Sequence, residues 1–441
     1  MSKHGARIIA LLDDRPDEGV FSVSREAFTD AAVFERELAQ VFEGTWVFLG
    51  LESQARNPHD FFTTHIGRQP VIVMRDAGGR LGCFLNSCRH RGALVCLERS
   101  GNQRAHVCRY HGWSYDSGGR CLTVTNEPDG QYAESFGGQS HDLQPIARFA
   151  SYRGLLFGSL TAEVPELERH LGDARVFLDL VMDQAERGFE LVPGAVTYTF
   201  DANWKLQFEN GLDFYHFDYT HASYVDVIRR RNARAEPEAG ALWVDDDSLA
   251  QGTFSFERGH AVMWANRNSL RVKRPVLADE AAYQRTLQRV GPERAKWMLL
   301  NRNLTIFPNM QLIDVHSLQL RVWRPLAVDR TEMTSWCLAP IGESAEARRR
   351  RIRQYEDFFN PTGLATSDDN VMYEFCQAGL RARAGDNQGY LRGMGAEPAH
   401  GLARKLQIEP ADAVAGSFAF GGETCMHAGY REWHRLLTAR T

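Results

Sequence analysis

The sequence predicts an α+β protein in which a small β domain precedes a larger domain of antiparallel sheet and helices. After Trp46, short apolar runs are separated by Gly, Asn, Asp and Pro, which is typical of strands joined by tight turns. After residue 190, runs of alternating apolar and polar residues predict an antiparallel sheet with one covered face. Stretches with apolar residues at helical spacing lie among these runs and predict the helices that cover the sheet.

Length and composition restrict the class of protein. The 441 residues suffice for two or three domains, and a hydrophobic fraction of 43% is ordinary for a packed globular protein. A net charge of −5 does not support a nucleic-acid-binding surface. The chain has no run of 18 apolar residues, and the short apolar run at residues 8–12 is followed directly by Asp13 and Asp14. We therefore expect a soluble, cytoplasmic protein without a membrane segment.

The first 160 residues are expected to contain one helix and then the β domain. Apolar residues at helical spacing predict the helix at residues 25–41. Strands are expected at residues 71–74, 82–85 and 155–157, and a new helix begins near residue 165. The predicted divisions of the chain are an N-terminal helical segment at 1–42 that packs on the second domain, the β domain at 43–160, and the second domain at 161–441.

The second domain is expected to combine strands with long helices. Strands are predicted at residues 195–200, 310–315, 319–323 and 332–337. Helices are predicted at residues 204–226, 279–301 and 344–360. Five arginines in the six residues from Arg348 to Arg353 suggest a docking surface, but a solvated face of a helix capped by Ser344 is the favoured interpretation.

The eight cysteines show no paired framework of the kind that cross-links small secreted domains. Six are expected to be reduced thiols of the core, in agreement with a reducing cytoplasm, namely Cys83, Cys96, Cys121, Cys337, Cys376 and Cys425. The other two stand in the clusters Cys88-Arg-His90 and Cys108-Arg-Tyr-His111, with 17 residues between them. Each cluster offers one thiolate and one imidazole. This is the spacing of a Rieske [2Fe-2S] site, in which two cysteines bind one iron and two histidines bind the other.

A Cys2His2 zinc site is the alternative, because it uses the same ligands. Zinc sites usually pair like with like, whereas each cluster here is mixed, so the iron-sulfur interpretation is favoured. Gly92 and Gly112 lie close to the two histidines. Glycine lets a loop bend tightly around a cluster, and loop amides can then donate to its sulfurs.

A second group of ligating residues lies in the predicted helix at 204–226. Glu209, Asp213 and His216 are four and three residues apart, which places them on one helix face. His221 follows His216 by five residues, about 140° round an ideal helix. Both imidazoles can reach one metal only if the helix bends, bulges or ends between them, and Gly211 weakens the helix nearby.

Two histidines need a carboxylate to form the facial triad that binds Fe(II). The chain offers Asp368-Asp369 at an expected helix start. The alternative is that the histidines are core residues and the two aspartates cap a helix. An electron-relay cluster in the same chain favours the iron interpretation, because a relay needs a place to deliver electrons.

The two metal motifs in this order resemble those of the large (α) subunit of Rieske non-haem iron aromatic-ring-hydroxylating oxygenases. The resemblance runs from about Phe34 to the C-terminal region and includes residues 43–50, 203–205, 209–216, 307–310 and 321–325. It implies a Rieske β domain and a catalytic domain of helix-grip (START-like) type, with an antiparallel sheet around long helices. It also implies a [2Fe-2S] cluster on Cys88, His90, Cys108 and His111, and a mononuclear Fe(2+) on His216, His221 and Asp369.

The same resemblance gives Asp213 the role of a bridging residue that hydrogen-bonds a ligand histidine and faces the neighbouring subunit's His111. It therefore implies a trimer, either α3β3 with a small β subunit or an α3 homotrimer. Electrons from NADH are expected to arrive through a separate reductase, with or without a ferredoxin.

The substrate expected from the resemblance is an aromatic carboxylate, hydroxylated with O2. Two residues separate Asn210 from Asp213, which is similar to the benzoate, anthranilate and salicylate group. The alternatives are an N- or O-demethylase, an oxygenase of neutral aromatic hydrocarbons, and a Rieske electron-transfer protein that is not an enzyme. No single arginine can be assigned to the substrate carboxylate. Pocket candidates by motif position, which plain core packing explains equally well, are Asn210, Leu212, Phe217, Tyr224, Met263, Phe307 and Ala365.

Overall fold

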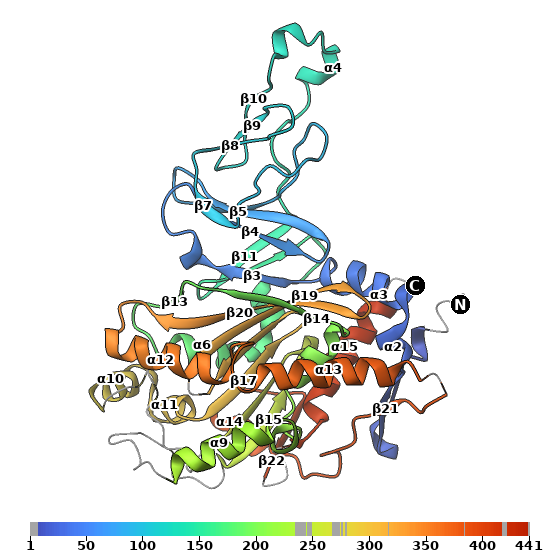
Figure 1. Ribbon diagram of the computed structural model, residues 1–441, viewed down its shortest axis with the longest axis vertical. Helices are drawn as coiled ribbons and strands as arrows, with labels where there is room; N and C mark the ends of the chain where they lie inside the picture. The colour runs from blue at the N-terminus through green and yellow to red at the C-terminus, as the bar shows by residue number, and fades with distance from the viewer. Residues whose placement is uncertain are drawn as a thin grey trace. The chain divides into compact units, whose positions relative to one another are not determined.

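The computed structural model describes residues 8–233, 249–266, 280–315, 317–382, 384–416 and 421–439, together with Val244, Arg274 and Leu277 (Figure 1). These residues form two compact units. One unit extends from Phe42 to Leu167, and the other joins the residues up to Val41 with those from Glu168 onward. None of the described helices is both long and apolar enough to span a membrane.

The 42–167 unit consists of three small antiparallel sheets. Their strand orders are β6-β5-β4-β7, β10-β9-β8 and β11-β12-β3, and a short helix, α4 (Glu134–Gly137), follows β10. The predicted strands at 71–74, 82–85 and 155–157 are confirmed within β5, β6 and β12. The strand bounds are β3 Val47–Leu51, β4 Asp60–Ile66, β5 Gln69–Arg75, β6 Leu81–Leu85, β7 Ser100–Asn102, β8 Ala105–Val107, β9 Ser114–Asp116, β10 Cys121–Thr123, β11 Arg148–Tyr152 and β12 Leu155–Ser159.

Strand β5 shows why this unit folds around two core clusters. Val71 and Val73 are buried in one cluster, whereas Ile72 and Met74 are buried in the other. Successive side chains of a strand point to opposite faces, so a continuous apolar run buries both faces. The cluster around Ile72 and Met74 also contains both cysteines of the predicted iron-sulfur site, which are thereby fixed in the core beneath their loops.

The second unit is organised by a nine-stranded antiparallel sheet, which confirms the predicted α+β class. The strand order is β13-β20-β19-β18-β17-β16-β15-β22, and β14 also pairs with β20. All four predicted strands are confirmed, in β14, β18, β19 and β20. The bounds are β13 Phe189–Leu191, β14 Val196–Phe200, β15 Gln251–Ser255, β16 Ala261–Ala265, β17 Asn301–Ile306, β18 Met310–Asp314, β19 Leu318–Ala327, β20 Arg330–Pro340 and β22 Asp412–Ala415. A separate small sheet has the strand order β1-β2-β21 and is formed by β1 (Leu12–Arg15), β2 (Val20–Val23) and β21 (Gln388–Gly389).

Helices pack against this sheet (Figure 1). Helices α7 and α12 contact β19, α13 contacts β14 and α7, and α15 contacts β15 and β16. The predicted helix at 344–360 is confirmed as α12, and Ser344 caps it by accepting a hydrogen bond from the N–H of Ala347 at 3.1 Å. The bounds are α5 Leu167–Leu171, α6 Arg175–Met182, α7 Trp204–Asn210, α8 Phe217–Thr220, α9 Ala222–Asn232, α10 Glu280–Val290, α11 Pro292–Met298, α12 Ala345–Phe358, α13 Thr366–Leu380, α14 His400–Lys405 and α15 Thr424–Thr438.

Two predicted helices are divided, so their predicted lengths were wrong. Residues 25–41 form α2 (Glu26–Thr29), α3 (Ala31–Glu37) and a π-helical turn at Leu38–Phe42, because Asp30 leaves the helical conformation and caps α3 with its side chain. Residues 279–301 divide into α10 and α11 at Gly291, whose φ of 82° is left-handed.

The predicted helix at 204–226 is also interrupted, and the interruption shapes the second metal site. The side-chain amide of Gln311 on β18 donates to the carbonyls of Gln207 and Phe208 at 3.3 and 3.2 Å. It thereby satisfies carbonyls at the C-terminal end of α7, which a continuing helix would satisfy with its own N–H groups. A Cβ at Gly211 would lie 2.0 Å from Nε2 of Gln311, so a larger residue does not fit without displacing this cap.

The arginine-rich stretch of α12 is not a fully solvated face, so the favoured interpretation was wrong for part of it. Arg351 is fully buried and pairs with Glu343 at 3.0 Å. Arg348 pairs with Glu190 of β13 at 2.6 Å and with Glu343 at 3.2 Å. These ion pairs fasten α12 to the edge of the sheet.

All eight cysteines are free thiols. Cys83, Cys96, Cys337 and Cys425 are buried, as predicted, whereas Cys121 is half-buried and Cys376 is exposed. The prediction of core positions was therefore wrong for the last two, because Cys376 lies on the outward side of α13.

Glu37 of α3 is the buried acceptor that joins the N-terminal segment to α7 and α15. Its fully buried carboxylate accepts from Nζ of Lys205 at 2.5 Å and from the indole N–H groups of Trp204 and Trp433 at 2.8 and 2.7 Å. Lys205 is equally buried. A buried ion pair is tolerated only when further hydrogen bonds satisfy its charges, and the two indoles supply them here.

Glu37→Ala is expected to lower the free energy of unfolding by about 3–5 kcal/mol, because it leaves the Lys205 ammonium buried without a counter-charge. The measurement is the midpoint of urea-induced unfolding followed by tryptophan fluorescence. Asp329→Ala is the control, since it removes an exposed ion pair with Arg381, and we expect it to cost less than about 1 kcal/mol. Equal losses for the two variants would contradict the role assigned to Glu37.

Candidate metal centres

Two loops of matching conformation present the predicted ligands of the first site. In each loop, the cysteine N–H donates to the carbonyl five residues on, and the glycine four residues on donates back to the cysteine carbonyl. The two distances are 2.8 and 2.9 Å for Cys88, and also 2.8 and 2.9 Å for Cys108. Gly92 and Gly112 have φ values of 73° and 75°, a left-handed conformation that closes each loop and favours glycine.

The structure brings the four predicted ligands of this site together. The two cysteines are 5% and 1% exposed and share one core cluster. His90 is exposed and His111 is half-buried, and their ring centroids lie 4.4 Å apart. The hydroxyl of Tyr115 lies 3.2 Å from Sγ of Cys88 and accepts a hydrogen bond from the N–H of Arg89 at 3.1 Å.

This donor set fits a [2Fe-2S] cluster. Thiols on the core side and imidazoles on the surface side suit two irons with different ligands, rather than one tetrahedral ion. The Tyr115 hydroxyl is placed to donate to a ligand sulfur, and hydrogen bonds of this kind tune the reduction potential of such a cluster.

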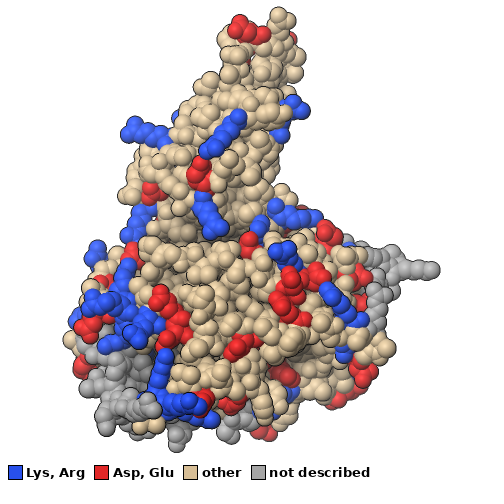
Figure 2. Space-filling view, viewed as in Figure 1, with Lys and Arg blue, Asp and Glu red and all other residues tan. Residues whose placement is uncertain are grey.

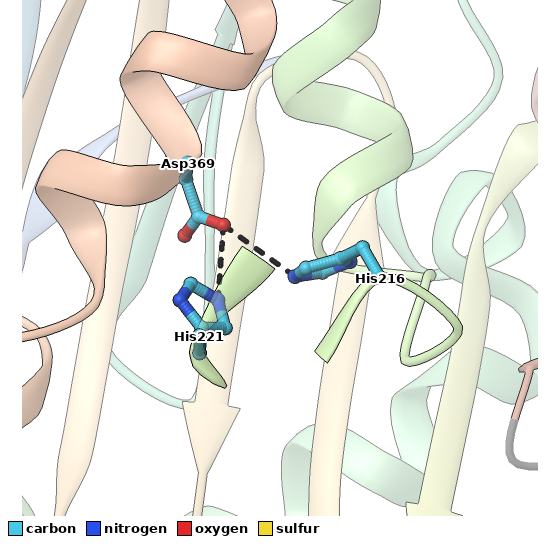
Figure 3. A group of neighbouring side chains, drawn as sticks. All are labelled: His216, His221 and Asp369. Atoms are coloured by element: carbon cyan, nitrogen blue, oxygen red, sulfur yellow. Dashed lines mark ion pairs between the residues drawn. The ribbon is translucent and has the colours of Figure 1, made fainter. Parts of the chain in front are cut away.

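The second site is a convergence of His216, His221 and Asp369 (Figure 3). Nε2 of His216 and Nε2 of His221 lie 3.4 and 3.1 Å from Oδ1 of Asp369. One ligand atom from each residue lies within 4.8 Å of the other two. The histidines stand at the two ends of the four-residue helix α8, and the predicted interruption falls at His221, whose φ of −102° and ψ of 30° are not helical; Asp369 lies in the first turn of α13. Two imidazoles and one carboxylate are the donor set of a facial Fe(II) site with open positions.

Each imidazole of this site also has a second carboxylate near Nδ1, the ring nitrogen that does not face Asp369. Nδ1 of His216 lies 3.3 Å from Oδ2 of Asp213, and Nδ1 of His221 lies 3.6 Å from Oδ2 of Asp368. Oδ1 of Asp213 also accepts from the backbone N–H of Tyr215 at 2.6 Å, which fixes the carboxylate in place. Such outer carboxylates orient ligand histidines, so that Nε2 of each ring faces the shared space.

The electrostatics of the site favour a cation. Burial lowers the pKa of His216, but the carboxylates of Asp213 and Asp369 outweigh burial and raise this pKa to about 9. Burial raises the pKa of Asp369, but hydrogen bonds from the two histidines outweigh it and hold this pKa well below its usual range. A metal ion can replace the protons that the carboxylates attract, because metal binding and proton binding compete for the same atoms.

Asn210, one of the pocket candidates, borders the triad directly. Its Nδ2 donates to Oδ1 of Asp369 at 3.1 Å and lies 3.4 Å from Nε2 of His216. Because α7 ends at this residue, its side chain turns toward the site. Asn210 thus contacts two of the three ligands.

Glu209 does not share a face with Asp213 and His216, so that prediction was wrong. The helix ends one residue after Glu209, and Oε1 of its half-buried side chain accepts from the hydroxyls of Tyr390, at 2.7 Å, and Tyr430. Burial raises the pKa of Glu209 to about 7, although the two tyrosine hydrogen bonds lower it. Glu209 therefore belongs to a buried polar cluster rather than to the metal site.

The other pocket candidates lie in different surroundings. Phe217 and Tyr224 gather around the ring of Phe358, with centroid distances of 6.3 and 4.6 Å, and the Phe217 ring lies 5.5 Å from that of His221. Phe358 also lies 5.9 Å from His221, and the sequence analysis missed it. Phe307 packs within 6.2 Å of Trp204 and Phe208 in an aromatic core. The remaining candidates, Leu212, Met263 and Ala365, are buried.

Two family models match this chain. The catalytic domain of the ring hydroxylating alpha subunit matches residues 190–438, which is more than half of the chain. The Rieske [2Fe-2S] domain matches residues 45–137, which contain both cysteine-histidine loops.

The chain is also similar to individual proteins of this kind. It is 42% identical to the alpha subunit of toluate 1,2-dioxygenase from Pseudomonas putida over 380 residues, which is 85% of this chain and 82% of that protein. It is 42% identical to the large subunit of anthranilate 1,2-dioxygenase from Acinetobacter baylyi over 383 residues, which is 84% of this chain and 80% of that protein. The crystal structure of naphthalene 1,2-dioxygenase from Rhodococcus sp., bound to indole, has a TM-score of 0.81 at 26% identity and covers 95% of both chains.

Asp369→Ala is expected to lose the mononuclear iron and to keep the iron-sulfur cluster, because the two sites come from different units of the chain. Asp368→Ala should retain most of this iron, since Asp368 faces only the Nδ1 side of His221. Iron and acid-labile sulfide analysis should give about three irons and two sulfides per chain for the wild type, and about two of each for Asp369→Ala. The reverse ranking of the two variants would contradict the ligand assignment, and zinc without sulfide would contradict the cluster.

Proposed function

Because this chain belongs to the ring-hydroxylating alpha-subunit family of Rieske non-haem iron dioxygenases, we propose that it hydroxylates an aromatic carboxylate of the benzoate or anthranilate type at adjacent ring carbons. The chemistry is supported by one observation: a single chain contains both the paired cysteine-histidine loops and the triad centred on Asp369. The substrate class is supported by the similarity to proteins named for toluate and anthranilate over about four fifths of each chain.

The residues of the catalytic unit hold the site in a fixed geometry. When bound, the [2Fe-2S] cluster and the iron supply electron transfer and the activation of O2. Asp213 holds the ring of His216 through Nδ1, and the amide of Asn210 holds the carboxylate of Asp369. His221 and Asp369 are buried, which keeps bulk water from this side of the site.

Small-subunit and electron-transfer partners follow from membership among large subunits of multicomponent dioxygenases. We extend this to a trimer, α3β3 or α3, in which Asp213 faces the neighbouring subunit's His111. NADH electrons would arrive through a reductase, with or without a ferredoxin, in the cytoplasm. Asp213 is 28% exposed and His111 is half-buried. Both side chains are therefore accessible to a residue of a neighbouring subunit, which supports this arrangement.

An oxygenase of neutral aromatic hydrocarbons is the second candidate. It is supported by the structural likeness to naphthalene 1,2-dioxygenase, although the identity of 26% is well below the 42% found for the toluate and anthranilate proteins. A protein that only transfers electrons would have no use for the triad of His216, His221 and Asp369. No feature of the described residues favours an N- or O-demethylase over a ring hydroxylase.

The enzyme with its reductase is expected to consume O2 and NADH when an aromatic acid is added, and to form a dihydroxylated product. The measurement is O2 uptake with product identification over a panel of benzoate, 3-methylbenzoate, anthranilate, salicylate, toluene and naphthalene. Product from the carboxylates only would agree with the proposal. Product from the hydrocarbons only would support the second candidate instead.

Asp213→Ala is expected to keep a reducible cluster but to lose about 10- to 100-fold or more of its substrate-dependent turnover, as is typical for outer-shell partners of a ligand histidine. Asp213→Asn should be nearly as harmful, because a neutral amide is a weaker partner than a carboxylate for the Nδ1–H of the ligand His216. Stopped-flow single turnover of the pre-reduced enzyme is the measurement. Wild-type rates of cluster oxidation in Asp213→Ala, on mixing with O2 and substrate, would show that Asp213 is not the bridge.

A further inference from the structure

Arg321 of β19 is a buried cation beside the iron triad. Its side chain is 6% exposed. Nε donates to Oε1 of Gln319 at 2.9 Å, Nη1 lies 3.5 Å from Oδ1 of Asn210, and the guanidinium lies 5.7 Å from the ring centroid of Phe359. Each of these partners is electrically neutral.

The other buried arginines of this unit have carboxylate partners. Arg274 and Arg302 both pair with Asp314, and Arg351 pairs with Glu343 at 3.0 Å. Among the residues that the structure describes, Arg321 makes no ion pair. A buried charge without a counter-ion is costly, and proteins usually supply a partner for it. A ligand carboxylate would supply the missing charge here.

Arg321 lies one side chain away from the metal ligands. The amide of Asn210 contacts Nη1 of Arg321 through its oxygen, and contacts Oδ1 of Asp369 and Nε2 of His216 through its nitrogen. A small aromatic acid whose carboxylate met Arg321 would therefore have its ring within reach of the iron site.

The free donors of Arg321 form one edge of the guanidinium. Gln319 occupies Nε and is itself fixed, because its amide donates to Oγ of Ser335 at 2.7 Å and to the carbonyl of Phe359 at 3.3 Å. Nη2 has no hydrogen-bond partner among the described residues, and Nη1 has one N–H to spare. The Nη1–Nη2 edge can thus take a carboxylate in a bidentate pair, which a lysine ammonium could not reproduce.

We propose that Arg321 binds the carboxylate of the aromatic substrate and sets the preference of this enzyme for aromatic acids over neutral arenes. This proposal rests on the proposed function, because it needs an aromatic carboxylate as substrate. Gln319 and Phe359 position the guanidinium, and Asn210 links it to the triad. The competing explanation is that Arg321 only balances the charge of Asp369 through Asn210, and so keeps the iron ligands in place.

The test compares Arg321→Gln and Arg321→Lys with the wild type in the assembled, iron-loaded enzyme with its reductase. The substrates are benzoate and its neutral isostere benzamide. We expect Arg321→Gln to raise KM for benzoate roughly 10- to 100-fold, which is the loss expected for a hydrogen bond to a charged group. The ratio of kcat/KM for benzoate to that for benzamide should fall by a similar factor, with iron content unchanged. Arg321→Lys should recover part of this ratio, since it keeps the charge but not the planar fork.

Arg324→Gln is the matched control. Arg324 lies on the same strand, is half-buried and is paired with Glu332 at 3.0 Å, so its loss should leave the benzoate-to-benzamide ratio unchanged. Equal losses for both substrates in Arg321→Gln, accompanied by loss of iron, would overturn the proposal in favour of a role in holding Asp369. An unchanged KM for benzoate would overturn it outright. Failure of the wild type to convert any aromatic acid would instead overturn the proposed function, and it is distinguishable because it appears without a substitution.

Discussion

The catalytic unit depends on one buried carboxylate, Asp369, whose Oδ1 is shared by three side chains. Asn210 approaches from the end of α7, and His216 and His221 approach from the two ends of α8. A buried carboxylate is tolerated only if it is compensated, so these segments must all arrive at one point. The ends of α7 and α8 place these three side chains around Asp369.

The break after α7 illustrates how distant residues meet the requirement. This break precedes both histidines and leaves Asn210 at the helix end, beside Asp369, whereas the interruption between the histidines falls at His221, where α8 ends. Gln311, a residue of β18, takes up the carbonyls at the end of α7 and leaves room only for glycine at position 211. A residue of the sheet, Gln311, therefore determines where α7 ends. The spacing of the histidines predicted the interruption that the structure has at His221, but the earlier break after α7 depends on Gln311, which lies about a hundred residues further along the chain.

The two metal sites differ in how far the sequence alone predicts them. Each iron-sulfur loop is a local structure of six residues, in which a cysteine, a histidine and a glycine at fixed spacing determine the turn. Such a loop is predictable, because all its determinants are neighbours in the chain. The triad joins segments about 150 residues apart, so the residues left Asp368 and Asp369 as equal choices until the resemblance to a family separated them. The structure distinguishes them by depth, since Asp369 is buried and shared by both rings, whereas Asp368 faces only Nδ1 of His221.

Arg321 was beyond the reach of sequence reasoning for a different reason. Arg321 is informative because it has no carboxylate partner among the described residues, and this can be recognised only when its neighbours in space are known. Lys205 is just as deeply buried, yet Glu37 and two indoles satisfy that ion pair, so it serves the fold alone. Arg321 has amides and an aromatic ring around it instead, which hold its position without neutralising its charge. The other buried arginines each contact a carboxylate, whereas Arg321 beside the metal ligands does not, and the carboxylate of a bound substrate would supply that charge.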